Sequence, residues 1–233
     1  MKKINTKIRS FIAISDVTSL LNMSSGFLSI ISSINNDLNT ASALMLIAII
    51  FDSIDGWIAR KTNRNDELGF GKNIDSLSDV ISFGVAPAIL IYSSNSLFYI
   101  NSIILTIVCL LIITCGILRL ARYNVLADKL DSNAFIGLPI PTMGCIVSTY
   151  YLSGLFNLNY ALILSVITSI LMISNVKYPK IENKAVITVC AILLIMIMIP
   201  QNISFNIPAI LLLIITLSYL LINLIKTIVT PNN

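Results

Sequence analysis

Apolar residues occur along this chain in long continuous blocks, which short polar loops separate. The blocks are about 17–25 residues long, the length that a helix needs to cross the ~30 Å hydrocarbon core of a bilayer. We expect membrane-spanning helices at residues 17–34, 41–61, 75–95, 98–122, 140–156, 158–174, 184–200 and 206–227. The pattern therefore predicts an all-α polytopic membrane protein with about eight transmembrane helices.

Composition supports the same class. Of the 233 residues, 56% are hydrophobic and 11% are charged, and the mean hydropathy is +0.91. A soluble domain of this length does not have such a composition. We expect a single transmembrane catalytic domain at 17–227, an interfacial amphipathic segment at 1–16 before it, and a short cytoplasmic tail at 228–233.

The basic residues predict the orientation of the helices. All 15 Lys and Arg residues lie in the N-terminal segment, in three alternate loops and the helix ends beside them, or near the C-terminal end. The four remaining loops, INNDLNT, SSNS, GLFNLN and QNISFN, contain none. Because cytoplasmic loops carry the excess of Lys and Arg, we expect both termini in the cytoplasm of a cell-membrane protein. The net charge of +4 then describes a cytoplasmic face suited to anionic membrane lipids, and it gives no reason to expect nucleic acid as a partner.

Four carboxylates interrupt the apolar blocks. An Asp at the middle of a membrane helix costs about 2.5–3.5 kcal/mol, so a group of them needs a binding partner. On a helix, residues three apart lie about 60° from one another and residues four apart about 40°. Each pair of acids therefore shares one face of its helix, and consecutive helices bring the pairs together at the predicted cytoplasmic side. The acids are Asp52 and Asp55 in one helix and Asp75 and Asp79 in the next.

Converging carboxylates are the ligands of hard divalent cations. An all-oxygen site suits Mg²⁺ or Mn²⁺, and four negative ligands predict two ions. The chain has no histidine, so acid–base chemistry must use carboxylates, hydroxyls, Lys or Arg. Gly56 and Ala59 leave room for a ligand close to the helix, and Arg60 offers an anion contact. The alternative is that the acids pair with Arg and Lys for topology or helix packing.

The spacing of these residues matches a known signature. The segments DSIDGWIAR at 52–60 and GKNIDSLSD at 71–79 resemble the motif of the CDP-alcohol phosphotransferases. These membrane enzymes move a phosphatidyl-type group from a CDP-linked lipid to an alcohol and release CMP. The resemblance implies their fold, a divalent metal cofactor and a homodimer.

The resemblance also implies roles for single residues. The metal ligands would be Asp52, Asp55, Asp75 and Asp79, with Asp79 also the general base, and the cytidine nucleotide would contact Gly56, Ala59 and Arg60. The segment DVTSLLN at 16–22 resembles the start of the family's first helix, which implies nucleotide contacts for Thr18 and Asn22. Without the family, Asp16 to Thr18 is equally well explained as a helix cap.

Three further segments resemble the phosphatidylserine synthase branch, in which the acceptor is L-serine: SDVISFGVAPA at 78–88, RLARYNV at 119–125 and FIGLPIP at 135–141. The donor would be CDP-diacylglycerol or CDP-archaeol. A serine acceptor needs a cation for its carboxylate. Arg119 and Arg122, three apart on one helix face, are the candidates. The alternative is that both arginines anchor the helix at the membrane surface.

Two other functions fit part of the pattern. An acceptor with a phosphate, glycerol 3-phosphate or inositol phosphate, would use the same arginines. A cation transporter would also place Asp residues in the membrane. The transporter does not explain Gly56, Ala59 or the second motif with its own glycine.

Overall fold

The structure is a computed structural model that describes residues 7–62, 68–126, 134–180, 183–199 and 206–229. Its α-helices are α1 (Ile14–Ile34), α2 (Leu38–Lys61), α3 (Phe70–Asp79), α4 (Ala86–Ser93), α5 (Ser102–Leu126), α6 (Pro141–Leu152), α7 (Leu158–Ile173), α8 (Lys184–Met198) and α9 (Ile207–Val229). The other elements are η1 (Ile8–Ser10), η2 (Val80–Val85), η3 (Ser94–Leu97), β1 (Ala134–Ile136) and β2 (Lys177–Pro179). Residues 1–6 of the predicted interfacial segment and 230–233 of the predicted tail lie outside the described residues.

The predicted helical membrane architecture is confirmed. Within the described residues, five helical segments are long and apolar enough to cross a membrane: Ile14–Ile34, Leu38–Lys61, Phe70–Leu97, Ser102–Leu126 and Ile207–Thr227. Helices α6, α7 and α8 have 12, 16 and 15 residues, shorter than a full crossing needs. The eight crossings and the cytoplasmic termini therefore stay predictions.

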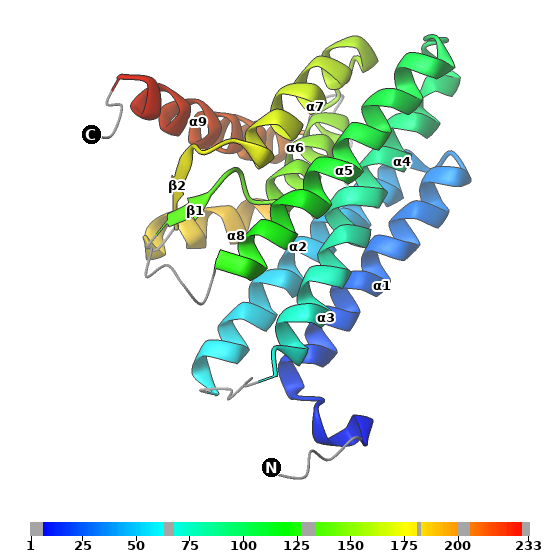
Figure 1. Cartoon of the computed structure of the whole chain (residues 1–233). Coiled ribbons are helices and arrows are strands. Elements are labelled where there is room, and N and C mark those ends of the chain that lie inside the picture. The colour runs from blue at the N-terminus through cyan, green and yellow to red at the C-terminus, as the bar shows by residue number, and fades with distance from the viewer. Residues whose placement is uncertain (1–6, 63–67, 127–133, 181–182, 200–205, 230–233) are drawn as a thin grey trace.

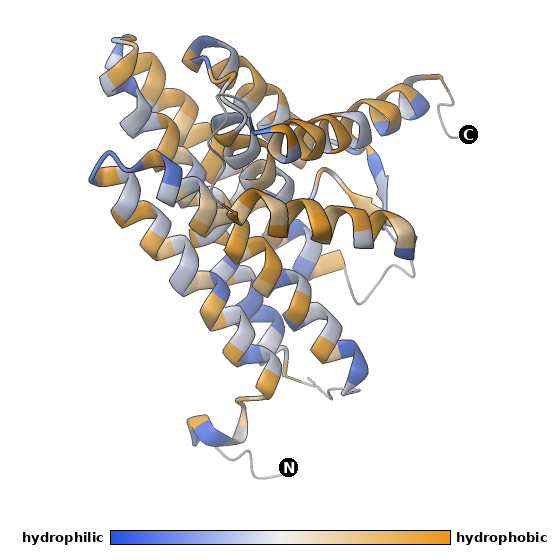
Figure 2. Ribbon diagram, turned by 180° about the vertical axis from the view of Figure 1, so that it is seen from behind, coloured by the Kyte–Doolittle hydropathy of each residue, from blue (hydrophilic) through white to orange (hydrophobic). Residues whose placement is uncertain are grey.

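The helices form a bundle in which α1, α2, α3 and α5 run side by side (Figure 1). The C-terminal end of α2 and the N-terminal end of α3 lie at the end of the bundle where α1 begins. Hydrophobic positions cover long stretches of the outer helices, and α9 is hydrophobic along most of its length (Figure 2). An apolar outer surface is what a helix bundle presents to lipid.

One face of α1 consists of small and polar residues that pack against its neighbours. The buried positions on this face are Ser15, Ser19, Asn22, Ser25, Gly26, Ser29 and Ser33. Small side chains let membrane helices approach closely, since the backbones can come together without a clash. This face packs against α2, α3, η2 and α4, so α1 lies along the helices that carry the four acids.

The third helix differs from the sequence expectation in two ways. It begins at Phe70 and not at residue 75, so Asp75 lies inside α3. It then continues through a π-helical segment, η2, which ends two residues before Pro87. Pro87 has no N–H for the backbone hydrogen bond of an α-helix, which explains the change of hydrogen bonding here. The wider turn brings the Ser82 hydroxyl to the Asn22 carbonyl oxygen, to which it donates at 2.9 Å.

Helix α1 contacts η2 so closely that residue 26 has no room for a side chain. A Cβ atom at Gly26 would lie 2.6 Å from the Ser82 Cα and would overlap the Ser82 Oγ. Because backbone cannot move aside cheaply, we expect Gly26→Ala to destabilise the protein by about 1–3 kcal/mol. The melting temperature in detergent measures this effect. Ser24→Ala, at an exposed position of the same helix, is the control and should leave it unchanged.

A short antiparallel sheet, which the sequence did not predict, joins the chain after α5 to the chain after α7. Strands β1 and β2 pair Phe135 with Tyr178. The strands have three residues each, too few for an alternating pattern to be visible in the sequence. The sheet lies beside the C-terminal half of α5 (Figure 1).

Candidate active site

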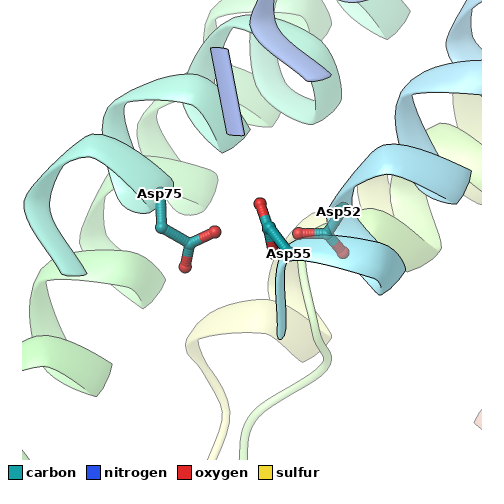
Figure 3. Close-up of side chains that lie close together, drawn as sticks. All are labelled: Asp52, Asp55 and Asp75. Atoms are coloured by element: carbon teal, nitrogen blue, oxygen red, sulfur yellow. The ribbon is translucent and has the colours of Figure 1, made fainter. Parts of the chain in front are cut away.

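Three acids meet where the last turns of α2 face α3. One carboxylate oxygen from each of Asp52, Asp55 and Asp75 lies within 4.8 Å of the other two. Figure 3 shows the three side chains pointing toward one another from the two helices. Asp55 is buried, and Asp52 and Asp75 are half-buried.

Asp79 lies one turn after Asp75 and is only 5% exposed. Its carboxyl group interacts electrostatically with those of Asp52 and Asp75. The Asn22 amide nitrogen donates a hydrogen bond to Asp79 Oδ1 at 3.1 Å. The structure thus brings all four predicted acids into one cluster, with Asp79 at its buried end.

Helix α1 adds two residues that the sequence reasoning did not assign to this site. The Ser19 hydroxyl donates to Asp55 Oδ2 at 2.7 Å. Asp16 is 1% exposed and interacts electrostatically with Asp55 and Asp75. Its Oδ2 accepts the Ala13 N–H at 2.9 Å, which is the helix-capping role that remained open from the sequence. Ser15, Ser19 and Asn22 share one face of α1, and this spacing indicates a polar face but not the residues that it contacts.

The Ser19 contact predicts a moderate functional effect. A hydrogen bond to a carboxylate contributes about 1.5–3 kcal/mol, and without it Asp55 is free to turn away from the other acids. We expect Ser19→Ala to raise the metal concentration needed for half-maximal activity by about tenfold, while activity at saturating metal changes less. The control is Ser53→Ala, because the exposed Ser53 hydroxyl on α2 donates to the Ile49 carbonyl of its own helix.

The cluster fits a divalent metal ion. Its donors are carboxylate oxygens alone, the set that hard divalent cations prefer. Negative charges this close, at buried and half-buried positions, repel one another strongly unless a cation neutralises them. Asp52, Asp55 and Asp75 would hold such an ion directly, with Asp79 beside them.

The predicted nucleotide contacts lie on both sides of the acids. Gly56, Ala59 and Arg60 follow Asp55 on α2, and a Cβ atom at Gly56 would be 3.3 Å from the Arg60 guanidinium. Arg60 is exposed. The half-buried Thr18 donates its hydroxyl to the Ser15 carbonyl oxygen at 2.7 Å. The side-chain oxygen of Asn22 is buried and has no hydrogen-bond partner among the described residues.

Arg119 faces the acids from α5. It is 5% exposed and interacts electrostatically with Asp79 and Asp52. Its guanidinium lies 5.2 Å from the ring centre of Tyr123 and 5.7 Å from that of Phe135. Its buried Nε has no hydrogen-bond partner within the described part of the chain. A buried guanidinium with an unused donor beside a cluster of acids is suited to an anionic ligand.

Arg122 has a different environment, although the sequence placed it with Arg119. Its Nη1 donates to the Ile173 carbonyl at 3.0 Å. Its Nη2 lies 2.9 Å from each of the carbonyl oxygens of Ile136, Met172 and Ser174. The structure therefore places Arg122 between β1 and the end of α7. Its predicted contact with the acceptor stays a prediction.

Comparison with known proteins gives the family. The family model described as CDP-alcohol phosphatidyltransferase matches residues 12–176, a range that contains every residue of the acid cluster. The archaetidylserine synthase of Methanothermobacter thermautotrophicus is 54% identical over 178 residues, covering 76% of this chain and 74% of that protein.

Two further relatives are named CDP-diacylglycerol–serine O-phosphatidyltransferase. The protein of Methanocaldococcus jannaschii is 42% identical over 187 residues, which cover 79% of this chain and 83% of the relative. The protein of Bacillus subtilis is 34% identical over 161 residues, which cover 69% and 86%. The chain belongs to the CDP-alcohol phosphatidyltransferase family.

Proposed function

We propose that the protein transfers a phosphatidyl or archaetidyl group from a CDP-linked lipid to the hydroxyl of L-serine and releases CMP. The observation that carries this proposal is the cluster of Asp52, Asp55 and Asp75, with Asp79 and the buried Arg119 beside it. The names of the relatives support serine as the acceptor. The protein would be a CDP-diacylglycerol–serine O-phosphatidyltransferase or its archaeal counterpart.

The setting of the reaction is part of the proposal. The catalytic domain spans 17–227 and acts as a homodimer in the cell membrane, with the acids facing the cytoplasm, where the basic residues are predicted to lie. The cofactor is Mg²⁺ or Mn²⁺, with two ions held by the four Asp side chains. When bound, these ions would neutralise the pyrophosphate and stabilise the negative charge on the leaving phosphate.

Different residues of the site bind the nucleotide and transfer the proton in the proposed reaction. Gly56 and Ala59 let the CDP group approach α2, and Arg60, Thr18 and Asn22 contact it. Asp79, oriented by the hydrogen bond from the Asn22 amide, accepts the proton of the serine hydroxyl. The serine oxygen forms its bond to the lipid-linked phosphorus as the bond from that phosphorus to the CMP oxygen breaks.

Arg119 binds the serine carboxylate in this proposal. Its guanidinium can form two parallel hydrogen bonds with a carboxylate, which a Lys ammonium cannot reproduce. We expect Arg119→Lys to raise the KM for serine by about ten- to a hundredfold, with a much smaller change in the KM for the CDP-lipid. Steady-state rates of CMP release at varied serine and at varied CDP-lipid measure the two constants. Equal changes in both would contradict a role in acceptor binding.

The experiment that tests the function is an acceptor panel. The purified protein is incubated with CDP-lipid, Mn²⁺ or Mg²⁺ and one acceptor at a time: L-serine, glycerol 3-phosphate or inositol phosphate. CMP release with serine alone supports the proposal. Equal release with glycerol 3-phosphate would contradict the acceptor, and no release with any acceptor would contradict the reaction.

A further inference from the structure

Arg122 ties three separate segments of the chain together. Its side chain leaves α5 and donates to the Ile136 carbonyl in β1 and to the carbonyls of Met172, Ile173 and Ser174. The last three carbonyls belong to the C-terminal end of α7, where no further turn of helix supplies donors. A cation at this position also interacts favourably with the helix dipole. We call this set of contacts the Arg122 clamp.

The chain around the clamp is packed closely. Gly137, directly after β1, has φ +80°, and a Cβ atom there would overlap the Met172 carbonyl oxygen and Arg122 Nη2. The Gly137 N–H donates to the Val176 carbonyl at 2.8 Å, and the Leu138 N–H donates to the Leu171 carbonyl at 3.0 Å. The clamp therefore holds β1 at one place against the end of α7.

The position of β1 determines what lies beside Arg119. Phe135, the residue before Ile136, places its ring 5.7 Å from the Arg119 guanidinium. The same residue pairs with Tyr178 in β2. Tyr178 is fully buried, and its ring packs at an angle against that of Tyr219 of α9, with 5.5 Å between the ring centres. Arg119 therefore lies between the acids on one side and the ring of Phe135 on the other.

We propose that Arg122 is a positioning residue for the acceptor: by fixing β1 against α7, the Arg122 clamp keeps Phe135 against Arg119 and so keeps the Arg119 guanidinium directed at the acid cluster. This inference rests on the proposed function, since it takes Arg119 as the acceptor ligand. In this proposal Arg122 acts through β1 and not by contact with the acceptor, since its Nη atoms donate to the backbone carbonyls of β1 and of the end of α7.

A double-mutant cycle separates positioning from direct binding. The variants Arg119→Lys, Arg122→Lys and the double variant all keep the positive charges, but Lys lacks the planar group that reaches several carbonyls at once. We expect Arg122→Lys to raise the KM for the acceptor by about tenfold and to leave the KM for CDP-lipid within about twofold. Because Arg122 acts through Arg119, the double variant should have an acceptor KM within about twofold of Arg119→Lys alone.

Other outcomes would overturn the inference. If the two effects multiply in the double variant, Arg122 contacts the acceptor independently. If Arg122→Lys raises the KM for the acceptor and the KM for CDP-lipid equally, the clamp does not act on acceptor binding. The same conclusion follows if neither KM changes. The matched control is Arg9→Lys, because Arg9 is exposed, and this variant should have the KM values of the wild type.

A second readout does not depend on activity. Hydrogen exchange of the Gly137 and Leu138 amides should become faster in Arg122→Lys and stay unchanged in Arg119→Lys, because only the first change releases β1. Unchanged exchange in Arg122→Lys would overturn the clamp. The KM is measured with whichever acceptor releases CMP from the wild-type protein. If an acceptor other than serine releases CMP, the serine assignment is contradicted. The KM for that acceptor would still test whether Arg122 positions Arg119.

Discussion

Asp79→Asn should lower the rate of CMP release by about 10²–10⁴-fold, while the protein remains folded. The substitution keeps the size of the side chain but removes the oxygen that accepts the serine proton. The new amide would still lie beside the Asn22 side chain, which donates to Asp79 in the wild-type protein. The serine hydroxyl is a poor nucleophile until its proton leaves, so the loss should appear in kcat more than in either KM.

The control for this variant is the same substitution at Asp37, the residue that caps the N-terminus of α2. Asp37 accepts the Thr40 N–H at 3.1 Å as the helix cap, and its hydrogen bonds with Thr40 hold the pKa of Asp37 below its usual range. Asn is also a good cap, so Asp37→Asn should keep full activity. Undiminished CMP release from Asp79→Asn would contradict the assignment of the base.

Removal of divalent metal ions should abolish the activity. Without a cation, the four carboxylates repel both one another and the pyrophosphate of the donor. We expect dialysis against EDTA to lower CMP release by at least about 10³-fold, and added Mg²⁺ or Mn²⁺ to restore it. Asp75→Asn should require a higher metal concentration for the same rate, because Asp75 is the ligand that α3 supplies to the three-acid cluster.

The melting temperature gives an independent measure of the same site. An ion that binds the folded protein stabilises it, so Mn²⁺ should raise the melting temperature of the wild type. Asp75→Asn should reduce that increase, and Asp37→Asn should show all of it. Full activity in EDTA, or an equal effect of Mn²⁺ on both variants, would contradict a metal site at these acids.

The helices and the acids were predictable from local patterns. Long apolar blocks give membrane helices because the bilayer demands a fixed length. The spacing of Asp52 with Asp55, and of Asp75 with Asp79, was enough to place each pair on one helix face. The short helices α6 to α8 were expected as full crossings, because hydropathy shows where a segment is apolar but not where its helix ends.

The contacts of the site were less predictable. Arg119 and Arg122 look equivalent in the sequence because they are three apart on one helix. Their difference comes from segments far along the chain: Arg122 bonds the end of α7, and Arg119 faces the acids. The bond from Ser19 to Asp55 joins residues 36 positions apart, and it depends on the packing of α1 against α2. Such contacts follow from helix packing, which a single helix pattern does not contain.

The most direct test of the central claim follows the serine itself. Radiolabelled L-serine and CDP-lipid are incubated with the purified protein and Mn²⁺, and the organic-extractable label and the CMP are measured in the same samples. The account predicts that labelled lipid and CMP form in equal amounts, and that both disappear in Asp79→Asn or in EDTA. CMP release without label in the lipid would contradict transfer to serine.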